Sequence, residues 1–167
     1  MEPLGLLAEC SITFAGFAAV LSALRGSQGL RGSFRAWTTV SQGLLAFVLS
    51  LLPLVLARAQ LSEADVWRIA SGIAAAATSV VWIWNLRVHR RLNALGEPAQ
   101  APLNLALALS LTPLSALLLL SNALGWPRAP GPFPYVLGIV LFLIAAVVAM
   151  AVSFWIPLRD SWNGGRE

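Results

Sequence analysis

Glu9 is the residue of this sequence whose position most strongly suggests chemistry. It stands about five residues inside an apolar stretch at 4–24. In a helix that rises 1.5 Å per residue, the carboxylate lies roughly 7–8 Å below the start of the stretch. A carboxylate inside a membrane span is costly and by default suggests a functional site. The alternatives are that the helix begins later, with Glu9 at the lipid headgroups, or that Glu9 is a protonated or paired structural residue.

Arg68 is the expected partner of Glu9. It begins another apolar stretch, and alternating spans would bring both residues to the same side of a membrane. An ion pair would offset much of the cost of burying either charge. Arg58 is the second choice of partner. Thr13 and Ser71 share helix faces with Glu9 and Arg68, so the sequence predicts an intramembrane polar site of Glu9, Thr13, Arg68 and Ser71.

A basic run, RVHRR, follows the third apolar stretch and contains Arg87, His89, Arg90 and Arg91. Arginines beside an apolar segment bind anionic lipid headgroups, and we expect this run to do so. A site for a phosphate-bearing metabolite is the alternative, although nothing in the sequence shapes one. His89 has a side chain that titrates near neutral pH, but we interpret it as an ordinary interfacial residue.

The sequence offers little for catalysis or metal binding. Cys10 is the single cysteine and His89 the single histidine, whereas a metal centre needs several convergent ligands. The motifs HExxH, GxSxG and a glycine-rich phosphate loop followed by lysine do not occur. We therefore predict no catalytic residue, no metal and no cofactor. We expect Cys10 to be a small buried thiol.

Composition explains where such a chain resides. Of its 167 residues, 58% are hydrophobic and 11% are charged, whereas a soluble domain has about 25% charged residues. So little charge would not keep the chain in water, but a lipid environment accepts apolar surface. The net charge of +4 could suggest nucleic acid as a partner. We reject that interpretation because the arginines are separated by apolar runs and do not form one basic face.

Five stretches are long and apolar enough to cross a bilayer, which takes about 20 residues. The predicted fold is therefore an all-α bundle of about five transmembrane helices in one domain, with spans at about 4–24, 38–57, 66–86, 103–124 and 134–157. The breaks are rich in Arg, Gly, Ser and Pro. Ser62 followed by Asp65 resembles a capping box at the start of the third helix. The segment GWPRAPGP cannot continue a helix.

Arginine counting predicts the orientation. The first and third loops and the C-terminal tail contain eight arginines, and the N-terminus and the other two loops contain three. We therefore expect the N-terminus outside and the C-terminus in the cytoplasm. Glu2 and Glu9 near the start argue against a cleaved signal peptide, which needs basic residues there.

Each predicted span has small or polar residues at helical spacing, such as Ser11, Ala15 and Ala19 in the first. Such stripes let membrane helices pack closely, and we interpret them as packing seams. The alternative is that their Ser, Thr and Asn groups line a wet path. Pro53 and Pro113 lie inside two of the spans, where we expect kinks.

The segment TFAGFAAVLSALR at 13–25, the SLLP break at 50–53, and Trp67, Arg68 and Ser71 in a W-R-x-x-S pattern carry a resemblance. About the first 70 residues resemble a loose group of small bacterial multi-spanning membrane proteins with a TFAGF-like first helix. The resemblance implies a multi-pass protein of the bacterial inner membrane. The group has no assigned activity, so no functional residues carry over.

The leading functional hypothesis is a non-enzymatic bundle that self-associates as a homo-oligomer, for passage of ions or small solutes. The competing hypothesis is an accessory, scaffold or sensor subunit that binds another membrane protein. A membrane-embedded enzyme is the third. Lipid is the expected environment in each case, and nucleic acid is not an expected partner.

Overall fold

The computed structural model describes residues 2–25, 29–95 and 102–163, and the side chains of 3–21, 34, 37–95 and 110–151. All regular structure within these ranges is helical. The elements are α1 (Glu2–Arg25), α2 (Gly29–Leu56), the short 3₁₀ helix η1 (Ala57–Ala59), α3 (Glu63–Ala94), α4 (Pro102–Leu124) and α5 (Pro132–Asn163). The predicted all-α class is confirmed.

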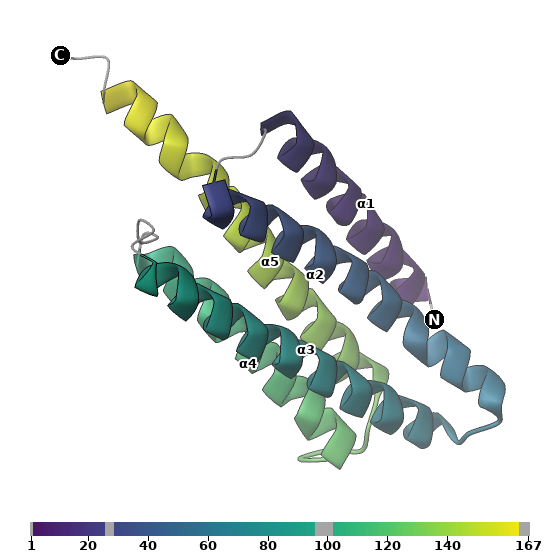
Figure 1. Cartoon of the computed structure of the whole chain (residues 1–167). Helices are drawn as coiled ribbons and strands as arrows, with labels where there is room; N and C mark the ends of the chain where they lie inside the picture. Colours follow the sequence, from purple (N-terminus) through teal and green to yellow (C-terminus); the bar gives the residue numbers. More distant parts are fainter. Residues whose placement is uncertain (1, 26–28, 96–101, 164–167) are drawn as a thin grey trace.

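The long helices run up and down beside one another, so the two termini lie at opposite ends of the bundle (Figure 1). Helix α1 packs mainly on α2, α3 packs on α4, and α4 packs on α5. The contact between α2 and α5 joins the α1–α2 pair to the other three helices. Helix α1 therefore lies at the edge of the bundle, with one face against its neighbours and one face outward.

Several helices are longer than the predicted spans. Helix α2 begins at Gly29 instead of near 38, and α3 continues to Ala94 instead of ending near 86. Helix α5 passes Pro157 and ends at Asn163. The physical reason is that hydropathy marks where the chain leaves the hydrocarbon of the bilayer, whereas a helix continues as long as its backbone hydrogen bonds do. The Arg-rich segments predicted as loops are largely helical ends.

Ser62 caps the start of α3, as its spacing to Asp65 predicted. The Ser62 hydroxyl accepts a hydrogen bond from the Asp65 backbone N–H at 3.2 Å and donates one to the Asp65 carboxylate at 2.6 Å. In a full capping box the third-position side chain reaches the backbone N–H of the cap residue. The shorter Asp side chain instead meets the hydroxyl, and the cap still satisfies a free N–H of the first turn.

The connection between α4 and α5 consists of residues 125–131, and its first residues close the end of α4. The Gly125 N–H donates to the Asn122 carbonyl at 3.2 Å and the Trp126 N–H to the Ser121 carbonyl at 3.0 Å. This pair of bonds is a Schellman motif, which needs a left-handed residue, and Gly125 has φ +71°. Pro132 then occupies the first turn of α5, where its missing N–H costs nothing.

Among the residues that the structure describes, four helices are long and apolar enough to cross a membrane, in the segments Pro3–Leu21, Trp37–Ala59, Glu63–Ala94 and Pro132–Ala151. The part of α4 with described side chains, Ser110–Leu124, is apolar but shorter than a span. Large apolar side chains, including those of Leu6, Val55 and Val80, are exposed around the bundle. An apolar exterior of this kind suits lipid.

The core is built around α5. Tyr135, Ile139 and Phe142 of α5 are completely buried, and they pack among residues of the other four long helices. The core also contains small or polar side chains, such as Ala46 and Ser50 of α2. This interior resembles that of membrane bundles, in which small residues permit close packing and hydroxyl or amide groups hydrogen-bond within it.

Candidate functional site

The four residues of the predicted polar site do not come together. Glu9 and Thr13 are exposed on the outward face of α1, and Arg68 is exposed near the start of α3. Ser71, one turn further along α3, is fully buried. Arg68 and Ser71 lie one turn apart on α3, but Arg68 is exposed and Ser71 is buried.

Arg68 pairs with Asp65 of its own helix and not with Glu9. The guanidinium lies 3.7 Å from the Asp65 carboxylate, and both side chains are about half exposed, at 55% and 49%. The expected Glu9–Arg68 pair is absent from the described residues because α1 packs on α2 and α5, whereas α3 packs on α4, α2 and α5. Arg58, the second choice, is exposed in η1 and is likewise not paired with Glu9 there.

Ser71 instead belongs to a clamp centred on Asn122 of α4. The Asn122 side-chain amide donates to the Ser71 hydroxyl at 2.7 Å and to the Gly131 carbonyl at 3.0 Å. Its carbonyl oxygen accepts the Gly131 backbone N–H at 3.0 Å. Asn122 is only 3% exposed, so these bonds form away from water. One side chain thus ties α3, α4 and the segment that leads into α5.

Tyr135 of α5 satisfies a backbone group that Pro53 leaves open in α2. Proline has no N–H, so the carbonyl four residues before it, that of Leu49, loses its helical partner. The Tyr135 hydroxyl donates to this carbonyl at 2.5 Å. The same ring lies 5.7 Å from the ring of Trp67, centroid to centroid and tilted by 54°. Sequence reasoning missed this link, although Pro53 required a donor and Tyr135 is the single tyrosine.

The remaining interior hydroxyl groups with described bonds serve helix packing. The Ser115 hydroxyl of α4 donates to the Gly138 carbonyl of α5 at 2.7 Å. Ser11, Ser50 and Thr78 donate to carbonyls one turn earlier in their own helices. These bonds satisfy the hydroxyl groups inside the bundle and agree with the interpretation of the stripes as packing seams.

Among the described side chains, two buried polar atoms lack a hydrogen-bond partner, namely Oε1 of Gln42 and Nε1 of Trp67. Gln42 lies on α2 and is 5% exposed, and Trp67 lies near the start of α3 and is 8% exposed. An unpaired buried polar atom costs about 1–3 kcal/mol. The two atoms differ in kind, because Oε1 accepts a hydrogen bond and Nε1 donates one.

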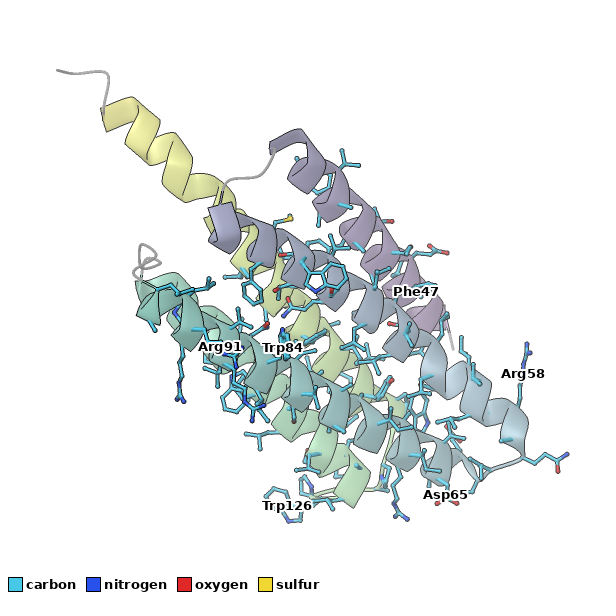
Figure 2. The ribbon with its side chains drawn as sticks, in the orientation of Figure 1. Phe47, Arg58, Asp65, Trp84, Arg91 and Trp126 are labelled. Atoms are coloured by element: carbon cyan, nitrogen blue, oxygen red, sulfur yellow. The ribbon has the colours of Figure 1, made fainter. Side chains whose placement is uncertain are left out.

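The basic run lies on the last turns of α3, at the end of the bundle opposite to Asp65 and Arg58, as Arg91 shows in Figure 2. Arg87, Arg90 and Arg91 are exposed, and His89 is half-buried. Cations near a helix C-terminus are favourable because the free carbonyls there carry partial negative charge. Contact of this exposed run with anionic headgroups stays a prediction.

Cys10 is exposed, so the expectation of a buried thiol is wrong. The reason is its position on α1, one residue after Glu9, on the outward side of that helix. Among the described residues, no three His, Cys, Asp or Glu side chains gather where they could hold a metal ion.

Comparison with known proteins found no match: no family model, no curated protein and no solved structure resembles this chain significantly.

Proposed function

We propose that this chain is a non-enzymatic multi-pass protein of the bacterial inner membrane that works by associating with further copies of itself. In this proposal it crosses the bilayer five times, with its N-terminus outside and its C-terminus in the cytoplasm. The four long apolar helices and the 23-residue α4 support the span count. The excess of arginines at one end supports the orientation. The resemblance of the first 70 residues supports the bacterial setting.

The observation that carries self-association is the placement of polar groups. Inside the bundle, the Ser, Asn and Tyr side chains with described bonds either hydrogen-bond to another helix of the same copy or donate to a backbone carbonyl of their own helix. Glu9, the charged residue expected inside a span, instead faces outward from α1. A lipid-facing carboxylate is costly, and a neighbouring protein surface relieves that cost. The outward face of α1 therefore favours contact with another protein.

This arrangement gives no support to a conducting path through one copy. Tyr135, Asn122 and Ser115 use their hydrogen bonds for packing, and the core between the helices is filled by apolar side chains. Passage of ions or small solutes would in this proposal run between copies. Flux into liposomes that contain the purified protein, compared with empty liposomes, measures this directly.

Native mass spectrometry from mild detergent tests self-association. We expect a discrete complex of two or more copies that persists on dilution, because a buried membrane interface dissociates slowly. A strict monomer under all detergent and lipid conditions would contradict the proposal. It would favour the competing function, an accessory or scaffold subunit whose outward face binds a different membrane protein.

A further inference from the structure

The outward face of α1 has an unusual composition for a surface in contact with lipid. Its centre line, opposite the side packed on α2, contains Glu9, Thr13 and Gly16 at helical spacing, and all three are exposed. A Cβ added at Gly16 would meet no atom within 4 Å. Leu6 and Val20 continue this line at its two ends, Phe17 lies beside it, and all three are also exposed. The face thus presents a carboxylate and two small residues framed by large apolar side chains.

Arg68 on α3 keeps unused capacity for a carboxylate. Its guanidinium has five N–H donors, and its contact with Asp65 at 3.7 Å is longer than a hydrogen bond. Asp65 meanwhile accepts the short bond from the Ser62 hydroxyl at 2.6 Å. Among the described residues, Glu9 has no ion-pair partner. One exposed carboxylate and one incompletely paired guanidinium therefore remain on two different faces of the molecule.

Close contacts relate the depths of these two charges. A Cβ on Gly43 would lie 2.8 Å from the Ala15 Cβ, so these residues of α1 and α2 are level. Counting six residues along each antiparallel helix makes Glu9 level with Leu49. The Leu49 carbonyl accepts the Tyr135 hydroxyl, and the Tyr135 ring contacts the ring of Trp67, which precedes Arg68 in the sequence. Glu9 and Arg68 thus lie at similar depth, to within about two turns of 5.4 Å.

The two faces also match in the size of their residues. Helices α1 and α3 run in the same direction through the bundle (Figure 1). Four and eight residues after Arg68 come Gly72 and the exposed Ala76. They correspond to Thr13 and Gly16, which follow Glu9 by four and seven residues. Small residues at such spacing on both helices allow close parallel packing in a membrane.

We propose that the Glu9 face of α1 in one copy packs against the Arg68 face of α3 in a second copy, with an ion pair between Glu9 and Arg68. Copies related by rotation about the membrane normal keep their depth, so residues at similar depth in one copy stay at similar depth across the contact. Pairing α1 with α1 of the second copy would instead bring two Glu9 carboxylates together, which is unfavourable. The contact joins two different faces, so it can repeat. This inference rests on the self-association proposed above.

Mixing of charge variants tests the contact. A Glu9→Arg chain and an Arg68→Glu chain, each alone, bring like charges together, and we expect association to weaken roughly 10- to 100-fold. Co-reconstitution of differently tagged Glu9→Arg and Arg68→Glu chains restores opposite charges between copies. We expect a mixed complex that neither variant forms alone. Glu63→Arg, a charge change at the exposed start of α3, is the matched control and should associate like the wild type.

Cross-linking provides a second measurement that needs no charge change. In a Cys10→Ser background, we expect Gly16→Cys and Ala76→Cys chains to form a disulfide-linked pair when mixed. Leu137→Cys, exposed on α5, replaces Ala76→Cys as the control. Absence of both the mixed complex and the cross-link between positions 16 and 76 would overturn the proposed contact. A Cys10–Cys10 link in the wild type would favour the α1–α1 pairing and would also overturn it.

The outcomes separate this inference from the proposed function. If the wild type is oligomeric by native mass and the Glu9 and Arg68 variants leave the oligomer unchanged, the proposed self-association stands and the proposed contact is wrong. If the wild type is strictly monomeric, both proposals are wrong. Recovery in a single chain that carries both reversals, without recovery in the mixture, would indicate an ion pair within one copy and would contradict the contact between copies.

Discussion

Pro53 and Tyr135 illustrate how single residues of this bundle depend on one another. Pro53 removes one helical hydrogen bond from α2, and the Tyr135 hydroxyl of α5 supplies the replacement at Leu49. In a lipid environment no water competes to satisfy that carbonyl. The carbonyl that Pro53 leaves unpaired in α2 therefore forms a hydrogen bond that holds α2 and α5 together.

Removing the hydroxyl group alone should destabilise the bundle. We expect Tyr135→Phe to lower the free energy of unfolding by about 1–2 kcal/mol, because the Leu49 carbonyl then stays unpaired. The phenylalanine ring keeps the packing against Trp67. Unfolding by a denaturing detergent, followed by circular dichroism, measures the change.

The Pro53→Ala background provides the control for this prediction. Alanine has the backbone N–H that proline lacks, so the Leu49 carbonyl regains a helical partner and the Tyr135→Phe change should cost less. We expect a coupling of roughly 0.5–1 kcal/mol between the two sites. Equal costs in both backgrounds would mean that the hydroxyl group does not compensate for the proline.

At the scale of helices, α1 approaches α2 closely at Gly43. Gly43 is buried against Ala15, and the atoms nearest to an added Cβ include the Ala15 backbone, at 3.1 Å and 3.2 Å. A backbone cannot move aside as a side chain can. At Gly138 the obstacle is the Leu119 side chain instead, at 2.6 Å, which can change its rotamer. The α1–α2 contact is thus the less forgiving of the two.

Gly43→Ala should therefore push α1 away from α2. We expect a loss of about 1–3 kcal/mol in unfolding free energy, as for other overpacked cores. Gly5→Ala, at a position of α1 where an added Cβ meets no atom within 4 Å, is the control and should leave stability unchanged or slightly raised. Should the two variants prove equally stable, the close approach at Gly43 would not hold α1 in place.

At the scale of the whole molecule, the antiparallel helices sort the charges by end. The run that contains Arg87, Arg90 and Arg91 closes α3 at one end, and Arg58, Asp65 and Arg68 lie toward the other (Figure 2). Arg25 at the end of α1, and Arg31 and Arg35 in the first turns of α2, lie at the same end as this run (Figure 1). Basic residues are retained on the cytoplasmic side during insertion.

Reporter fusions test the proposed orientation. We expect a green fluorescent protein fused after Glu167 to fluoresce and an alkaline phosphatase fused there to be inactive, as for a cytoplasmic terminus. Fusions after Arg128, between α4 and α5, should give the reverse result because one fewer span separates them from the N-terminus. An active phosphatase after Glu167 would contradict the cytoplasmic placement of the C-terminus.

The sequence alone predicts the all-α class, the helix breaks at Ser62 and Gly125, and the packing stripe that contains Ser11. Hydropathy and capping depend on residues close together in the chain, so spacing reveals them. The start of α2 and the end of α3 could not be predicted from hydropathy, because a helix can continue after the chain has left the hydrocarbon of the bilayer.

Only the tertiary structure decided which polar residues meet. Glu9, the residue of greatest interest in the sequence, faces away from the bundle, and Arg68 has Asp65 as its neighbour. The Ser71–Asn122 and Leu49–Tyr135 bonds join residues 51 and 86 positions apart. Their partners depend on which helices are adjacent and how each is rotated about its axis. Helical spacing shows that residues share a face, whereas only packing determines whether that face lies toward the core or toward lipid and a neighbouring copy.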